Sequence, residues 1–266
     1  MSVTDILVAL IFKIMGDKME DKIFASKIRD KIKQYIATKR SVNTTFLDMS
    51  ELGIAQSILK SQKGIEYYIS GGYIDAEMKM LILGDSEENI DEYIKCVEIN
   101  LPEEVYGKYL HRDYLGTIMS LGFERNRVGD IIVLDTKAYV MVCSDLADYV
   151  QYMLTQDKKF KKAKIDIIPC SSIQDFKRKF EMKKITLNTP RLDSIVAQLA
   201  NTSRTNAEKL LSLGKVFVNC AEESKATRLV KEKDILVIRG IGKFEIEEFC
   251  GENRKGKLVL KVKKYV

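Results

Sequence analysis

Tryptophan is absent from this chain of 266 residues, histidine occurs once and proline three times. A nucleophile system that depends on histidine would therefore rest entirely on His111. The cysteines are odd in number and none forms a C-x-x-C pair; they are Cys96, Cys143, Cys170, Cys220 and Cys250. This pattern excludes a disulfide framework and a zinc site, and predicts reduced thiols in a cytoplasmic protein. No metal or other cofactor is expected.

Long hydrophobic runs are also missing. The apolar run Ile6–Phe12 is too short to span a membrane, and it lacks the basic region and cleavage site of a signal peptide. The run is expected to begin a buried or amphipathic helix. Alternatively, the natural start is Met19, and residues 1–18 are an N-terminal extension. The chain is expected to stay in the cytoplasm, away from membranes.

What is present indicates a globular α+β protein of two or three domains, since 45% of its residues are apolar. An α/β region is predicted over 19–90. Its first helix follows from apolar residues at three- to five-residue steps, and its second covers 48–60. Strands at 66–70 and 77–83 are separated by the turn Gly71-Gly72.

A second domain is predicted over 91–170. Its expected elements are strand 96–99, helix 109–121, strands 130–134 and 138–143, helix 145–154 and strand 165–168. This βαββαβ order is the ferredoxin-like arrangement that RNA-recognition domains share. Such domains stack bases on aromatic residues of their central strands. Here strand 138–143 has only Tyr139, so base stacking on this sheet is not expected.

Five lysines lie between Lys158 and Lys164, before a predicted linker at 171–186. Two interpretations of this cluster stay open, a solvated strand edge and an auxiliary contact to phosphates.

Two fragments resemble catalytic motifs but lack the required context. His111-Arg112-Asp113 is similar to a kinase catalytic loop, yet Thr117 stands where an asparagine is needed, and a helix-end hydrogen-bond cluster is the expected role. The run from Arg239 to Lys243 lacks the spacing of a phosphate-binding loop and is expected to be a glycine-rich turn, which can face RNA. We therefore predict no catalytic residue.

Positive charge is concentrated in the last third of the chain. Residues 183–266 hold 18 Lys and Arg against 10 Asp and Glu, a net charge of +8, whereas the remaining 182 residues have a net charge of −2. A polyanion would therefore be drawn to one end of the chain. Helices at 192–199 and 204–213 and strands at 215–219, 235–238 and 258–262 are expected within a domain spanning 187–266.

The two helices of this domain have clear boundary signals. Ser203 suits the N-cap of the second helix, and Gly214 suits the position after its end. The helices are expected to pack on each other and to present a cationic, hydrogen-bonding edge to RNA phosphates. The residues predicted to bind RNA are Arg191, Ser203, Arg204, Lys209, Lys215, Asn219 and, from the glycine-rich turn, Lys243.

This ordered set resembles the αL-type RNA-binding module named after ribosomal protein S4, with Cys220 where that family commonly has glycine. The segments from Arg112 to Gly122 and from Arg125 to Ile131, with Gly71-Gly72-Tyr73, resemble the bacterial YlmH family. That resemblance implies binding of rRNA and tRNA on the large ribosomal subunit carrying peptidyl-tRNA, in ribosome-associated quality control. It also implies a further quality-control protein as a partner.

The expected function is thus non-enzymatic binding of structured RNA by a monomer. The alternative is an RNA-modifying enzyme, similar to a pseudouridine synthase, that uses the S4-type domain to dock its substrate. That alternative would need a catalytic aspartate, for which Asp113 and Asp130 are the candidates. A scaffold whose slightly acidic first two-thirds docks a partner protein is a third reading, compatible with the first.

Overall fold

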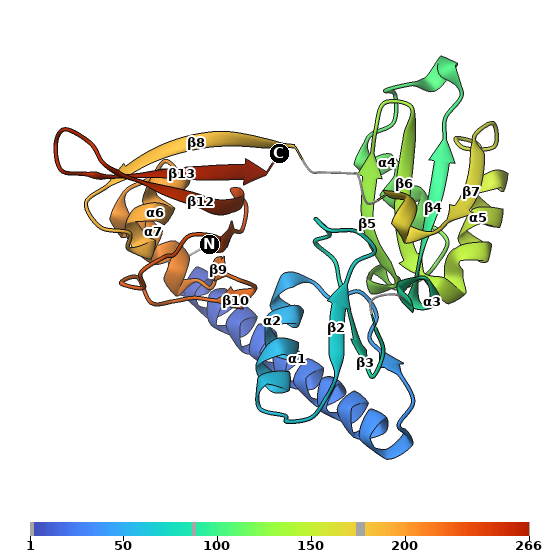
Figure 1. Cartoon of the computed structure of the whole chain (residues 1–266), viewed down its shortest axis with the longest axis horizontal. Helices are drawn as coiled ribbons and strands as arrows, with labels where there is room; N and C mark the ends of the chain where they lie inside the picture. Colours follow the sequence, from blue (N-terminus) through green and yellow to red (C-terminus); the bar gives the residue numbers. More distant parts are fainter. Residues whose placement is uncertain (1–2, 87–88, 174–178, 266) are drawn as a thin grey trace. The chain divides into compact units, whose positions relative to one another are not determined.

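The computed structural model describes residues 3–86, 89–173 and 179–265. It divides into two compact units, residues 1–177 and 178–266, and each is described by itself (Figure 1). Within the described residues, no helix has the length and apolar character needed to cross a lipid bilayer.

The first part of unit 1 combines helices with a small antiparallel sheet in the order β1-β3-β2. Asp48 caps the second helix through a reciprocal capping box, accepting from the Glu51 amide at 2.9 Å while the Glu51 carboxylate accepts from the Asp48 amide at 3.0 Å. The elements are α1 (Val3–Thr38), β1 (Val42–Asn43), α2 (Met49–Lys60), β2 (Tyr67–Ser70) and β3 (Met80–Leu83).

The rest of unit 1 is a four-stranded antiparallel sheet in the order β5-β6-β4-β7. Its chain order β4-α4-β5-β6-α5-β7 is the βαββαβ order predicted from the sequence. The elements are α3 (Ile90–Tyr93), β4 (Ile94–Asn100), α4 (His111–Met119), β5 (Val128–Val133), β6 (Lys137–Cys143), α5 (Ala147–Gln156) and β7 (Lys164–Ile168). Short 3-10 turns lie at η2 (Glu103–Val105), η3 (Arg125–Arg127), η4 (Ser144–Leu146) and η5 (Cys170–Ile173).

Both faces of this sheet contribute to a hydrophobic core. One face packs on α4 and α5, with Val97, Val140 and Val150 among the buried residues. The other face packs on the first part of the unit, where Met141 belongs to one cluster with Phe46. The sheet surface that RNA-recognition domains use for bases is therefore largely occupied by the protein itself.

Asp130 fastens the two parts of unit 1 together. Its carboxylate accepts hydrogen bonds from the Tyr73 hydroxyl at 2.7 Å and from the backbone amides of Glu77 and Met78 at 2.7 and 3.1 Å. Beside it, a Cβ on Gly129 would lie 2.5 Å from the Phe46 ring, so only glycine fits there. The motif residues that resemble the YlmH family thus have a structural role in this fold.

Unit 2 is a six-stranded antiparallel sheet in the order β10-β9-β11-β12-β13-β8, packed against two helices. Residues of both helices and of the sheet share one hydrophobic core, which includes Leu192, Ala207 and Phe244. The sequence predicted that the two helices pack on each other. The elements are β8 (Phe180–Leu187), α6 (Leu192–Leu199), α7 (Arg204–Ser212), β9 (Val216–Val218), β10 (Ala221–Glu222), β11 (Ile235–Ile238), β12 (Gly242–Glu252) and β13 (Leu258–Tyr265).

The structure differs from the sequence-based prediction at the linker and at β12, a strand that was not predicted. Residues 180–186 were assigned to the linker, but they form most of β8, which pairs with β13 along its whole length. Residues 174–178 of that linker lie outside the described residues. At the N-terminus, residues 3–18 form the first part of α1, which is one helix of 36 residues.

Candidate nucleic-acid interface

A buried carboxylate organises the start of both helices in unit 2. The side chain of Asp193 is fully buried and accepts from Arg191 at 2.8 Å and from Arg204 at 2.7 Å. Burial alone would raise the pKa of Asp193, but these two hydrogen bonds and one from the Ser194 amide hold the pKa below its ordinary value. The Arg204 side chain remains 55% exposed, so its position is fixed while its charge still faces solvent.

Helix α7 has the boundaries that the sequence predicts. The Ser203 side chain accepts from the Asn206 amide at 3.2 Å at the N-cap. At the other end, Gly214 takes a φ of +64°, and its amide donates to Leu211 while that of Lys215 donates to Leu210. This is the Schellman arrangement, which ends the helix and places Lys215 just beyond it.

A groove of about 620 Å³ lies at the N-terminus of α7. Its charged lining residues are Arg204 and Lys257, and among the residues that the structure describes no acidic side chain lines it. The helix N-terminus adds backbone N–H groups and the positive end of the helix dipole. The polar residues of the lining are Thr186, Asn188, Thr189, Ser194, Gln198, Asn201, Thr202 and Ser203. The groove is therefore suited to an anionic group that also accepts hydrogen bonds.

A second basic cluster surrounds the C-terminal end of α7. Lys209 lies in the last turn of the helix and, like Lys215, is exposed. The backbone carbonyl of Lys215 accepts from the Arg239 amide at 2.8 Å, which places Arg239 beside Lys215. The Arg239 guanidinium lies 4.7 Å from the centroid of the Phe217 ring. The sequence-based set omitted Arg239 and Lys257, because each approaches this surface from a distant strand or turn.

The two other predicted residues lie apart from these clusters. Asn219 occupies the β9–β10 turn, where its side chain donates to Asp234 at 2.7 Å and accepts from the Ile235 amide at 2.9 Å. Its amide group is thus engaged within the protein. Lys243 lies on β12, with its Nζ 5.0 Å from the Tyr265 ring centroid. The turn before it is the predicted glycine-rich hairpin, in which Ile238 pairs with Gly242.

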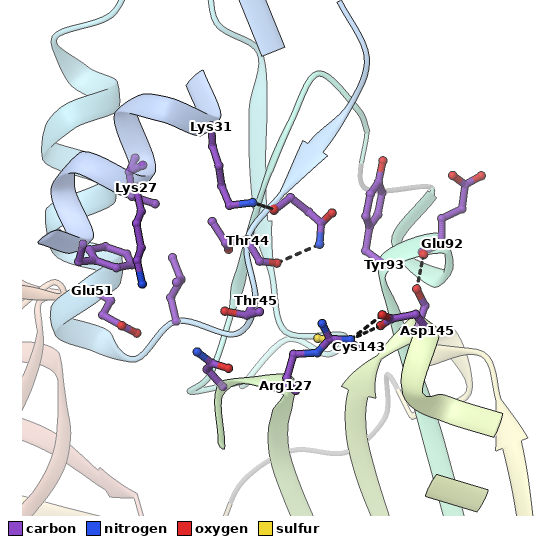
Figure 2. A pocket seen from close by; sticks show the side chains of 16 residues that line it. Lys27, Lys31, Thr44, Thr45, Glu51, Glu92, Tyr93, Arg127, Cys143 and Asp145 are labelled. Carbon is purple, nitrogen blue, oxygen red and sulfur yellow. Dashed lines mark hydrogen bonds and ion pairs between the residues drawn. The ribbon is translucent and has the colours of Figure 1, made fainter. Parts of the chain in front are cut away.

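Unit 1 has a separate pocket of about 540 Å³ between α1, α2 and the turns that flank β5 and α5 (Figure 2). Lys31 reaches in from α1 and donates to the Asn43 carbonyl at 2.6 Å, and burial lowers the pKa of Lys31. Arg127 donates to Asp145 at 2.5 Å. Three basic and three acidic side chains line this pocket, so its charge is balanced and gives no preference for an anion.

The aspartates considered as catalytic candidates both have structural partners. Asp113 accepts from the Leu110 amide at 2.9 Å and lies 3.7 Å from Lys159, and the backbone hydrogen bond lowers the pKa of Asp113. This is part of the helix-end cluster predicted around His111, whose own side chain is exposed. Asp130 is buried, and its carboxylate joins the two parts of unit 1 by accepting a hydrogen bond from the Tyr73 hydroxyl. Among the described residues, no group of acidic, cysteine and histidine side chains could hold a metal ion.

Comparison with known proteins identifies two family models that together match residues 20–173. One, described as "YlmH, N-terminal", matches residues 20–88, and the other, described as "Putative RNA-binding domain in YlmH", matches residues 88–173. The chain is 30% identical over 222 residues to the ribosome-associated protein quality control protein P2 of Bacillus subtilis, across 80% of this chain and 83% of that protein.

The chain is also similar to a solved structure, the cell division protein ylmH from Streptococcus pneumoniae. The TM-score is 0.50 at 21% sequence identity, and the match covers 59% of this chain and 95% of that chain. At this identity the likeness concerns the fold alone.

Proposed function

The chain belongs to the YlmH family, and from that premise we propose that it binds structured RNA on the ribosome through unit 2. The observation that carries the proposal is the groove at the N-terminus of α7, which has basic but no acidic lining residues. Arg204 is held there by the buried Asp193 and stays exposed. A fixed guanidinium next to a helix N-terminus matches the geometry of a phosphate group.

The finer proposal concerns the ribosomal site. The Bacillus subtilis relative bears a name that associates it with the ribosome and with protein quality control. By that similarity, the chain would act in the cytoplasm on the large ribosomal subunit with peptidyl-tRNA, contacting rRNA and tRNA. Phosphate neutralisation and shape recognition would supply the affinity, with a dependence on salt that steepens with each phosphate contacted.

The proposed activity is binding without catalysis. Asp113 and Asp130 are both committed to hydrogen bonds that hold the fold, and the pocket of Figure 2 has its charges balanced. The alternative, an RNA-modifying enzyme that docks RNA through unit 2, therefore has no observation in its favour. An assay for modified nucleosides in RNA incubated with the protein tests it, with Asp113→Ala as the comparison.

The binding proposal is tested by co-sedimentation with purified large ribosomal subunits. Arg204 is a poor choice for charge reversal, because a glutamate there would face the buried Asp193. Lys209→Glu with Lys215→Glu avoids that clash, and we expect it to weaken association at least tenfold, since the basic cluster at the C-terminal end of α7 loses four units of positive charge. The matched control is Lys22→Glu with Lys39→Glu, which reverses two exposed lysines of unit 1, outside the lining of the groove. Undiminished association of the first variant, or equal loss in both, would contradict the proposal.

A further inference from the structure

The βαββαβ domain formed by β4–β7 with α4 and α5, called the middle domain below, has two sides, its sheet face and the side that carries the helices. The sheet face opposite α4 and α5 packs against the first part of unit 1. Any RNA contact by this domain must therefore use another surface. The turn between α5 and β7, residues 157–163, holds most of the lysine cluster noted in the sequence.

This turn is rigidly built. The Phe160 ring is fully buried and stacks on Tyr114, with ring centroids 5.1 Å apart. Three backbone hydrogen bonds close the turn, from Phe160 and Lys161 to the Asp157 carbonyl at 3.1 and 2.8 Å and from Ala163 to the Phe160 carbonyl at 2.8 Å. An aromatic anchor in the core thus fixes the backbone from which the lysines project. Little further ordering of that backbone would be needed on binding.

The lysines of this turn differ in their partners. Lys159 lies 3.7 Å from Asp113, and Lys164, at the start of β7, lies 3.2 Å from Asp166. Lys158, Lys161 and Lys162 are exposed, and no acidic side chain within the described ranges pairs with them. Three positive charges therefore project from one fixed turn without neutralisation.

Exposed aromatic rings accompany this charge. Tyr149 and Tyr152 on α5 are 45% and 63% exposed, and both lie on the helix that leads into the turn. Exposed ring faces offer stacking surfaces to unpaired bases, and Tyr152 precedes Lys158 by only six residues of the chain. The Tyr149 ring also packs edge-on against Phe123, with ring centroids 5.6 Å apart, so Tyr152, the more exposed of the two, is the stacking candidate.

We propose that residues 158–162, together with Tyr152, form a second RNA-binding surface on the helical side of the middle domain. The lysines contact the phosphate backbone and Tyr152 stacks on a base. This inference rests on the proposed function, since it assumes that the protein binds RNA. It adds a contact in unit 1 that is independent of the groove in unit 2.

The test uses the full chain and purified large ribosomal subunits at several salt concentrations. For Lys158→Glu, Lys161→Glu and Lys162→Glu combined, we expect the slope of log affinity against log salt to become shallower by about 2–3, roughly one for each lost phosphate contact. Replacement of the same lysines by glutamine should give the same direction with a smaller loss. Tyr152→Ala should weaken binding at every salt concentration without changing the slope, and Tyr152→Phe should not weaken it.

The matched control reverses three other exposed lysines of unit 1, Lys22, Lys39 and Lys63. The proposal is overturned if the triple variant of the turn keeps the wild-type slope, or if the control loses as much. If the triple variant binds as the wild type does while Lys209→Glu with Lys215→Glu does not, only this inference fails. If the wild-type chain shows no salt-dependent binding at all, the proposed function fails with it.

Discussion

The Asp193 side chain is buried, and its hydrogen bonds fix the orientation of two candidate RNA-binding arginines, Arg191 and Arg204. Its side chain is fully buried, so its charge depends on Arg191 and Arg204 for compensation. The arginines in turn lose rotamer freedom while keeping exposed guanidinium groups. A buried carboxylate of this kind preorganises the cationic side chains, so that less conformational entropy is lost when they bind a phosphate.

For Asp193→Asn we expect a loss of about 1–3 kcal/mol in the free energy of unfolding at neutral pH, because two charge-assisted hydrogen bonds lose their acceptor charge. The folded-state pKa of Asp193 lies below its ordinary value. The stabilising contribution is therefore complete well above the unfolded pKa of about 3.9, begins to fall as the pH approaches that value, and is lost progressively as the pH falls further toward the lower folded pKa. Urea unfolding of both proteins between pH 7 and 3 measures this. A stability difference that stayed constant down to pH 3 would disprove the role assigned to the charge.

Cys220 is a second residue with a local consequence. It follows Asn219 in a two-residue turn between β9 and β10, and both residues take positive φ values, +51° and +67°. Such a turn favours glycine at its second position, because a side chain there costs about 1–2 kcal/mol. We expect Cys220→Gly to stabilise unit 2 by about 0.5–1 kcal/mol after the added chain entropy of glycine is deducted.

The control for that substitution is Cys220→Ala, which removes the thiol but keeps the Cβ. If strain at positive φ is the cause, the alanine variant shows no such gain in the denaturant midpoint. Equal stabilisation by both variants would instead point to the thiol. The pairing of Asn219 with Asp234 should hold the turn in place in either protein.

At the scale of elements, the parts predicted from the sequence are those with local signals. Helix α6 was predicted with its observed bounds, and α7 to within one residue, since Ser203 and Gly214 mark its ends. Strands β8 and β12 were missed because their charged residues are frequent and their apolar alternation is weak. Their pairing with β13 is a long-range interaction that no local pattern reveals.

The same limit applies to the candidate site. Arg191, Arg204 and Lys215 could be identified because each lies at a helix end, the two arginines where α6 and α7 begin and Lys215 just beyond the end of α7. Arg239 and Lys257 could not, since they reach the surface from β11 and from the hairpin after β12. Asn219 suits an RNA contact by residue type, but its amide is used within the fold. The roles of all seven predicted residues in RNA binding remain predictions.

At the scale of the whole molecule, the covered sheet changes what the middle domain can do. Its topology is one that RNA-recognition domains share, but the packing of Phe46 and Met141 in one cluster occupies the sheet surface. The domain is left with its helical side and the turn at 157–163. Binding by the full chain would then combine two basic surfaces, one in each unit.

A combination of the two sets of substitutions tests whether both surfaces bind the same RNA. We expect the variant with charge reversals at Lys158, Lys161, Lys162, Lys209 and Lys215 to show a salt slope shallower than that of either parent variant. The reduction should be close to the sum of the two separate reductions, because contacts in different units are independent to a first approximation. Linked contacts on one RNA also raise the effective local concentration, so the combined variant should lose affinity by at least the product of the two separate losses. The measurement is binding to large ribosomal subunits across a salt series. A combined variant no weaker than the weaker parent would mean that only one surface contacts the RNA.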